Sequence, residues 1–485
     1  MISRQEGSPR ATEASVSTSL GWPRAAIAPS FRAGSITATL PDTTQVVSPG
    51  LSLPLPPAED LTEAVRDALE HPLDSPPLRE MARGAKRVTV AFDDPTVPCY
   101  APLWSTAVPI VLDELEGAGV DRERITLLCA NALHRKFTND ELARILGDGV
   151  VREFAPDGRL LCHDAEDPDG LDDLGTTAEG HHVDVSRHLT EADFTVYVNA
   201  STTRGFSGGW KSICVGLSSY RSIRAHHDPD TMSMSTERNR MHEILDSMGA
   251  VVEKRLGADR IFKVETLLSN PLQVHRVLGG SVGATRREVL EVTRRHQPPR
   301  RELLPEKVDV VVYGVPDWSP YAAFSSMNPI LTLISTGLGY LGGMIEALGK
   351  PGCTVILATP CPDRWDHDRH PSYKEVWDRV LPVTRNPYEA RELFEPEFAK
   401  RSDYIDRYRT GFGFHPTHAI MALYPLKRLR HAGRVIVAGA EDEAVVRHVG
   451  FEPVPTVEDA IALARNGHGP DPSVALIRYP PAVNR

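Results

Sequence analysis

The sequence predicts an α/β protein with two domains, each a mainly parallel or mixed sheet flanked by helices, and an active-site crevice between them. From about Thr37 onward, short β-type runs alternate with helical patterns, which is typical of strand-helix-strand units. This alternation breaks at residues 297–301 into glutamine, prolines and arginines, and a new strand opens at Val308. We therefore place a domain boundary there.

The predicted chain has three parts. Residues 1–36 mix small, polar and proline residues with no apolar signal-peptide core, so they are predicted to be a disordered leader. Residues 37–302 form the N-terminal domain and residues 303–485 the C-terminal domain, with the last segment as a candidate to pack back on the N-terminal domain.

Local periodicity predicts the individual elements. Apolar β-type runs predict strands at 88–92, 125–128 and 194–198 in the first domain, and at 308–313, 354–358, 434–438 and 474–477 in the second. Helical spacing of apolar residues predicts helices at 103–115, from about 138, at 237–252, near 328–347 and near 441–449.

Composition narrows the functional class. The chain has 485 residues, a net charge of −11 and 41% hydrophobic residues, which argues against nucleic acid as a partner and favours a small molecule. The six cysteines form no Cys-x-x-Cys pair, as expected in the reducing cytoplasm. No stretch is apolar enough for a membrane helix, so we expect a cytoplasmic protein without a membrane partner.

Chemically active residues follow the first three predicted strands. The first strand leads into Asp94 and Thr96, the second towards His134 and Arg135, and the third into the glycine loop 205–211. Ligands of open α/β sheets bind outside the carboxyl ends of the strands. An acid, a histidine and a lysine are therefore predicted to share one crevice.

The loop combines Gly205, Gly208 and Gly209 with Lys211. Glycines let backbone N–H groups approach a ligand, and the lysine can neutralise a phosphate or act as a nucleophile. Trp210 separates Gly209 from Lys211, so this is not a Walker A loop. A tight turn with a solvated lysine is the alternative for the loop alone.

Metal chemistry has two candidate segments. His226, His227 and Asp228 lie near enough to return to the crevice, and imidazole binds nickel, zinc or copper. The segment 367–370 also has a metal-like composition, but its proline-rich and charged surroundings indicate a solvated loop.

Together these stretches resemble the nickel-pincer-nucleotide-dependent lactate racemase family, of which this chain would be a divergent member. Residues 91–96 match the family's Asp-x-Thr-Arg-Pro turn, 132–135 its Gly-x-His-Arg segment and 205–211 its glycine-lysine loop. The spacing from Lys211 to His227 also fits.

The resemblance implies an isomerase that racemises or epimerises a 2-hydroxy acid or related hydroxy compound. Lys211 would carry the cofactor, a pyridinium-3-thioamide-5-thiocarboxylate mononucleotide with nickel, through a thioamide. His227 would complete the nickel site, and His134 would remove the substrate's hydroxyl proton while the C2 hydride passes to the cofactor. The resemblance also assigns the N-terminal domain to cofactor binding, through residues that include Asp94, Thr96, Gly205, Gly208 and Gly209. Its partners would be the substrate and the cofactor-biosynthesis enzymes.

The chain departs from the family at several substrate-handling positions. Ser201 stands where the family has its second catalytic histidine, and Val97 replaces the arginine of the first turn. The family's Tyr-Gln pair and lysine of the second domain have no clear match beyond Tyr321. We therefore keep Ser201 as a candidate catalytic residue. We expect Arg135 or Arg204 to supply the positive charge of the arginine that Val97 replaces.

These departures leave alternatives open. One is a non-catalytic descendant that binds the nucleotide or another metabolite, which Ser201 favours. Another is metal-assisted hydrolysis at His226, His227 and Asp228, although one short segment is a poor source of three zinc ligands. His134 also has a simpler interpretation as a histidine that only hydrogen-bonds the backbone, and Asp94 as a turn cap.

Overall fold

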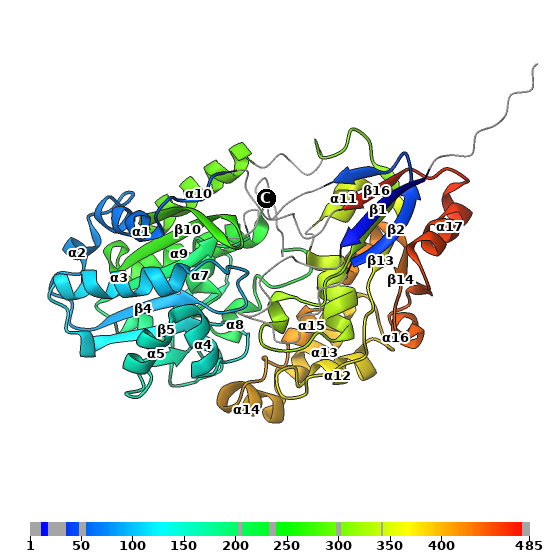
Figure 1. The fold of residues 1–485 in the computed structure, drawn as a ribbon. Helices are drawn as coiled ribbons and strands as arrows, with labels where there is room; N and C mark the ends of the chain where they lie inside the picture. The colour runs from blue at the N-terminus through cyan, green and yellow to red at the C-terminus, as the bar shows by residue number, and fades with distance from the viewer. Residues whose placement is uncertain are drawn as a thin grey trace, which may run out of the picture.

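The computed structural model describes residues 11–17, 35–47, 55–201, 206–231, 239–296, 302–340 and 343–477. Two halves, each built on a six-stranded sheet, face each other in Figure 1. Cyan and green segments dominate the half on the left, and yellow to red segments the half on the right. The predicted α/β class with two sheets flanked by helices is confirmed.

The first sheet has the order β11-β10-β9-β4-β5-β6 and is parallel except for its edge strand β11. Its strands are β4 (Val88–Asp93), β5 (Ile125–Ala130), β6 (Leu160–Cys162), β9 (Phe194–Ser201), β10 (Ile261–Asn270) and β11 (Gln273–Gly280). Every residue of β4 and β9 is buried. Continuous apolar runs are typical of parallel strands covered on both faces, which is why these strands were predictable.

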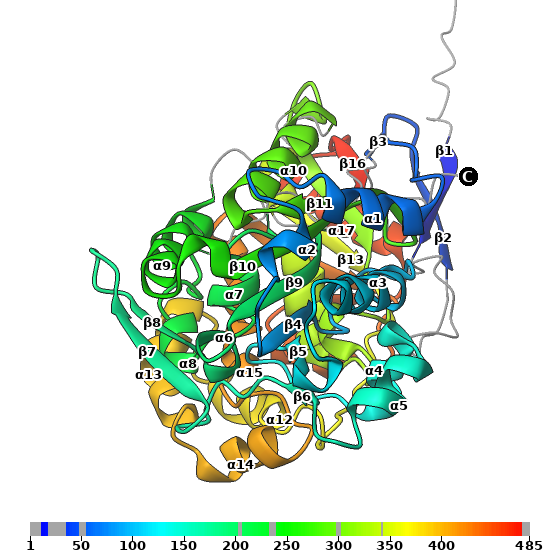
Figure 2. The same ribbon diagram turned by 90° about the vertical axis from the view of Figure 1, so that its left-hand side faces the viewer.

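Helices cover both faces of this sheet (Figure 2). One face packs on α1 (Leu61–Glu70), α3 (Leu103–Gly117), α4 (Asn139–Leu146) and α5 (Asp148–Phe154). The other packs on α7 (Lys211–Cys214) and α9 (Arg240–Leu256). The remaining elements of this half are α2 (Leu78–Met81), η1 (Arg122–Arg124), the β7 (Leu171–Thr176) and β8 (His182–Ser186) hairpin, α6 (Arg187–Thr190), α8 (Tyr220–Ile223), η2 (Ala258–Arg260) and α10 (Val282–His296).

The second sheet is parallel throughout and has the order β15-β14-β13-β12-β16-β3. Its strands are β3 (Gln45–Val47), β12 (Val308–Gly314), β13 (Gly349–Ala358), β14 (Ala432–Ala438), β15 (Glu452–Val454) and β16 (Val474–Ile477). Its helices are η4 (Pro320–Ala322), η5 (Ile330–Tyr340), α11 (Met344–Leu348), α12 (Tyr373–Glu375), η6 (Val376–Val380), α13 (Pro387–Phe398), α14 (Ser402–Thr410), α15 (His418–Met421), η7 (Tyr424–Arg430), α16 (Glu443–His448) and α17 (Val457–His468).

The N-terminal segment belongs to the second half, which differs from the predicted range 37–302. β3 pairs with β16 and so covers the edge of the second sheet. Ala38 and Leu40 of β2 (Ser35–Pro41) pack on the core of α17. The last described strand, β16, likewise lies in the second sheet and not on the first half. The domain boundary near residue 302 stays a prediction.

Two further expectations need qualification. The predicted leader, 1–36, lies largely outside the described residues, but its described segment 11–17 is a strand, β1 (Ala11–Ser17), that pairs with β2. The predicted helix 328–347 is in fact η5, a helix of π type, followed by the separate helix α11.

Across the ranges that the structure describes, no helix combines the length and apolar character needed to span a bilayer.

Candidate active site

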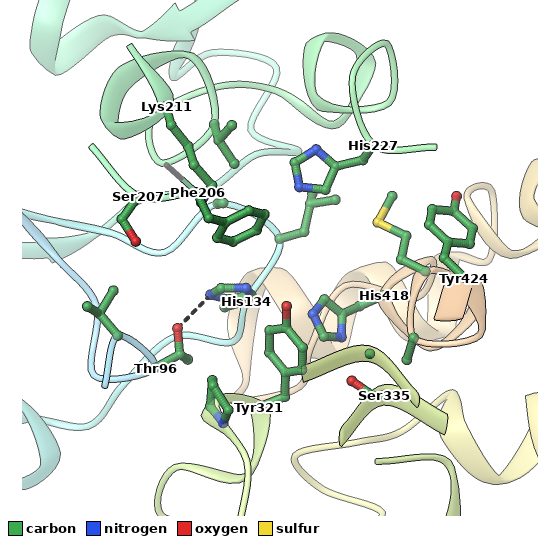
Figure 3. A pocket seen from close by; sticks show the side chains of 18 of the residues that line it. Thr96, His134, Phe206, Ser207, Lys211, His227, Tyr321, Ser335, His418 and Tyr424 are labelled. Carbon is green, nitrogen blue, oxygen red and sulfur yellow. Dashed lines mark hydrogen bonds between the residues drawn. The ribbon is translucent and has the colours of Figure 1, made fainter. Parts of the chain in front are cut away.

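A cavity of about 450 Å³ lies between the two halves. The first half lines it from the carboxyl ends of β4, β5 and β9 and from the glycine loop, and the second half lines it from η4, η5, α15 and η7. Figure 3 shows Lys211, His227 and His134 from the first half facing Tyr321 and His418 from the second. The three strand-end loops therefore meet as the sequence predicts.

His134 is held at the cavity wall by Asp94. Its Nδ1 donates to Oδ2 of Asp94 over 2.9 Å, and the Thr96 hydroxyl donates to Oδ1 of the same carboxylate over 2.8 Å. Since a carboxylate only accepts, this contact places a proton on Nδ1 and leaves Nε2 for a ligand. The arrangement suits a base that takes a proton at Nε2.

A second buried carboxylate, Asp93, orders the end of β9. It accepts from the Tyr197 hydroxyl over 3.0 Å and from the backbone N–H of Ala200 over 2.8 Å. Burial raises the pKa of Asp93 to about 6, although nearby Lys263 opposes the shift. Asp93 thus connects β4 to β9 just before the glycine loop.

Glu265 of β10 holds the glycine loop through hydrogen bonds. This carboxylate accepts from Ser201 Oγ over 2.9 Å and from the backbone N–H of Gly209 over 3.2 Å. Gly208 has φ of +85°, and a Cβ there would lie 1.9 Å from Oε1 of Glu265. Only glycine fits this close approach.

Lys211 begins α7 and extends its side chain into the cavity (Figure 3). Its Nζ lies 4.7 Å from the centre of the Phe206 ring, and among the described residues it has no carboxylate ion-pair partner. Burial lowers the pKa of the lysine below its ordinary value, against the opposing charges of Asp93 and Asp94. Desolvation of this kind makes an amine a better nucleophile.

His227 faces the same cavity as Lys211, whereas His226 does not line it. His226 is completely buried, and the Nδ1 atoms of the two histidines lie 2.9 Å apart. Burial, with the neighbouring His226, holds the pKa of His227 well below its usual range, so its imidazole is neutral and able to bind a metal. The cavity position distinguishes His227 from His226.

Asp228, the third metal ligand of the hydrolytic alternative, is engaged in a turn instead. Oδ1 of Asp228 accepts from the backbone N–H groups of Asp230 over 2.7 Å and Thr231 over 3.0 Å, as an ordinary turn cap does. Within the described ranges, no group of three His, Cys, Asp or Glu side chains is arranged to hold a metal ion.

Comparison with known proteins shows which family the sequence resembles. Residues 31–240 match the lactate racemase N-terminal domain. This part of the chain resembles the lactate racemase family at the low identity expected of a divergent relative. The lactate racemase of Lactiplantibacillus plantarum is 29% identical over 185 residues, which are 37% of this chain and 42% of that protein. The lactate racemase of Thermoanaerobacterium thermosaccharolyticum is 27% identical over 168 residues, 34% of this chain and 38% of that protein.

Sequence similarity therefore spans less than half of either curated relative, but the fold likeness is wider. The lactate racemase apoprotein from Thermoanaerobacterium thermosaccharolyticum superposes with a TM-score of 0.68 at 18% identity, covering 96% of this chain and 98% of that one. A Thermotoga maritima protein superposes with a TM-score of 0.52 at 15% identity, covering 87% and 96%. These structures establish the shared fold.

Two residues that the sequence analysis predicts to be catalytic lie outside the cavity. Arg135 is buried and donates two hydrogen bonds of 2.9 Å to Glu141 and one of 3.0 Å to the carbonyl of Ala323, so its charge is already neutralised. Ser201 is buried against Glu265 and does not line the cavity. These contacts give both side chains structural roles in the described fold, and their catalytic roles stay a prediction. Arg204 and Gly205 lie outside the described residues.

The predicted cofactor-binding residues divide by position. Asp94, Thr96, Gly208 and Lys211 line the cavity, while Gly209 lies behind the wall, held by Glu265.

The second half contributes groups that the sequence did not reveal. His418, Tyr424, Lys427 and Arg428 line the cavity, and no local motif marks them. Arg428 is paired with Glu346 at 2.5 Å, and Lys427 donates to the carbonyl of Pro229. Tyr321, the second-domain residue named in the sequence analysis, also lines the cavity.

Proposed function

We propose that the protein is a lactate-racemase-like isomerase that uses a lysine-tethered nickel-pincer nucleotide to racemise or epimerise a 2-hydroxy acid or related hydroxy compound. One observation carries the proposal. Lys211, His227 and His134, which the family resemblance assigns to tether, nickel ligand and base, face one cavity (Figure 3).

The described residues fit this cofactor. The Lys211 amine has no described carboxylate partner and a lowered pKa, as expected for an amine that becomes a thioamide. A neutral imidazole at His227 suits nickel, and the cavity volume is within the range of cofactor sites. When bound, the nickel-pincer nucleotide supplies a hydride acceptor and donor.

The residues of the chain itself bind and orient the substrate and move its hydroxyl proton. Nε2 of His134 takes the hydroxyl proton of the substrate, and Asp94 keeps the ring in position through Nδ1. The Tyr321 hydroxyl, whose pKa burial raises to about 12, stays protonated and donates a hydrogen bond to substrate oxygen. The two halves enclose the reacting atoms and limit access of water.

The cavity favours a substrate other than lactate. Val97 stands at the position of the family's arginine. Among the cavity-lining residues described, the only guanidinium is Arg428, which is paired with Glu346. A small carboxylate therefore lacks a free bidentate clamp. We propose a larger or less acidic hydroxy compound, such as a sugar acid or an aromatic hydroxy acid.

The test is a screen of holoenzyme produced together with the cofactor-biosynthesis enzymes, which we propose as partners. Pure enantiomers of aliphatic, aromatic and sugar-derived 2-hydroxy acids are incubated with it and resolved by chiral chromatography. We expect interconversion of at least one pair. A nickel-loaded protein that converts none of them would instead be the non-catalytic descendant.

Asp94→Asn is expected to slow turnover about 10- to 100-fold, because an amide no longer fixes the protonated Nδ1 of His134. The effect should fall on kcat, with nickel content unchanged. Steady-state kinetics and elemental analysis of the purified variant measure both. Unchanged kcat would show that Asp94 is only a turn cap.

Ser201→Ala separates the structural role of this serine from the catalytic one. The variant should lose about 1 kcal/mol of unfolding free energy with its hydrogen bond to Glu265 and keep turnover within about threefold of wild type. Urea denaturation and initial rates provide the two numbers. A loss of turnover comparable with that of a missing general base, about 100-fold or more, would restore Ser201 as a catalytic residue.

A further inference from the structure

Two imidazoles from opposite halves meet across a tyrosine ring in the cavity. The ring centres of His134 and His418 lie 5.4 Å apart at 85°, and Tyr321 lies 5.4 Å from His134 and 4.6 Å from His418. Figure 3 shows the Tyr321 hydroxyl directed towards the space between the two imidazoles. The three polar groups thus surround one part of the cavity.

His418 is positioned as firmly as His134. It is the first residue of α15, and its Nδ1 lies 2.7 Å from the Tyr373 hydroxyl. Its ring also packs against Phe414, with ring centres 4.6 Å apart. Within the described part of the chain Nε2 has no hydrogen-bond partner, and the residue lines the cavity.

The position of the family's second catalytic histidine is unsuitable here. Its occupant, Ser201, donates a hydrogen bond to Glu265 and does not line the cavity. Tyr321 is no substitute as a base at neutral pH, because its hydroxyl keeps its proton. Among the cavity-lining residues that the structure describes, His418 is the histidine whose ring contacts that of His134 and whose Nε2 has no partner.

We infer that His418 is the second proton-transferring residue of this site and acts on the opposite enantiomer to His134. The inference rests on the proposed function. Each imidazole presents the lone pair of Nε2 to the substrate while its Nδ1–H donates to a partner, the Asp94 carboxylate for His134 and the Tyr373 hydroxyl oxygen for His418.

The two imidazoles work with one proton between them. Nε2 of His418 would take the hydroxyl proton of one enantiomer as the O–H bond breaks, while a bound nickel-pincer nucleotide would supply the acceptor for the C2 hydride and its electron pair. When the hydride is added back to the other face of the 2-oxo compound, the imidazolium of His134 would return a proton to the oxygen and become neutral. Substrate and product have the same atoms and electrons. The opposite enantiomer uses the histidines in reversed roles, and proton exchange through the cavity restores the starting state.

The electrostatics agree with this division. Burial, with the charge of His134, lowers the pKa of His418 well below its ordinary value, so this imidazole starts neutral.

A single-turnover quench of holoenzyme tests the inference. Excess holoenzyme is mixed with each pure enantiomer of a converted hydroxy acid, stopped in acid, and assayed for the 2-oxo acid. We expect wild type to form it from both enantiomers. In His134→Ala, the rate of 2-oxo acid formation from one enantiomer should fall about 100-fold or more. In His418→Gln, the rate from the other enantiomer should fall to the same extent. Tyr373→Phe should weaken the same enantiomer as His418→Gln, to a smaller extent.

The controls separate this inference from the proposed function. His448→Gln, a half-buried histidine of the same half that does not line the cavity, should react as wild type. In cofactor-free protein, the ¹⁵N shift of His418 Nε2 should move with the converted hydroxy acid and not with the matching acid that lacks the hydroxyl.

Equal retention or equal loss of both enantiomers in His418→Gln overturns the inference, as does an unmoved ¹⁵N shift. If His418→Gln does not fold, the enantiomer preference of Tyr373→Phe decides in the same way. Wild type that forms no 2-oxo acid from any hydroxy acid refutes the proposed function instead.

Discussion

Lys211→Arg is expected to abolish both cofactor retention and turnover while the protein stays folded. Arginine keeps a positive charge beside Phe206, but its guanidinium cannot form the thioamide that a lysine amine forms. A ligand held only by charge would tolerate the change. Intact mass spectrometry of protein co-expressed with the biosynthetic enzymes should show the added mass in wild type and none in the variant.

A matched control is Lys350→Arg, an exposed lysine paired with Asp309 on the second half. It should carry the cofactor like wild type, which excludes a general effect of arginine on expression or loading. Retention of the same added mass by Lys211→Arg would show that Lys211 is a charge contact and not the tether.

His134→Ala has the second large expected effect. Removal of a positioned general base typically costs about 10² to 10⁴-fold in rate, and turnover between enantiomers needs both imidazoles. Nickel content should be unchanged, because the proposed function places His134 at the substrate and His227 at the nickel. Racemisation rate and nickel per chain are measured on the same preparation.

A control for this variant is His163→Ala, since His163 is buried in the same half and contacts the carbonyl of Ser218 away from the cavity. It is expected to lower stability without a specific loss of turnover per folded molecule. Wild-type turnover in His134→Ala would leave His134 as a loop histidine only.

The parts of the fold that could be predicted are those encoded locally. β4, β5 and β9 are continuous apolar runs, and α4 begins at a capping box formed by Thr138 and Glu141. The placement of β3 beside β16 could not be predicted, because pairing between distant edges leaves no local pattern. The π-type helix η5 was missed for a similar reason, since its apolar spacing resembles an ordinary buried helix.

The candidate site likewise has residues with a local sequence signal and residues that only distant contacts bring into place. Lys211 and His134 could be predicted to share the cavity because they follow strand ends in one sheet, where parallel topology brings their loops together. His227 follows α8 and not a strand, and its place beside Lys211 was predicted from the spacing in the family resemblance. His418 was not found, because only the docking of the second half brings it to His134. The burial of Arg135 away from the cavity had a local signal, because Glu141 in the capping box supplies the carboxylate that pairs with it.

The most direct test of the account is peptide mapping of wild-type holoenzyme by mass spectrometry, together with nickel analysis. The account predicts a covalent mass increase confined to the peptide that contains Lys211, with about one nickel per chain. An unmodified Lys211 peptide from protein that is nickel-loaded and converts hydroxy acids would contradict it.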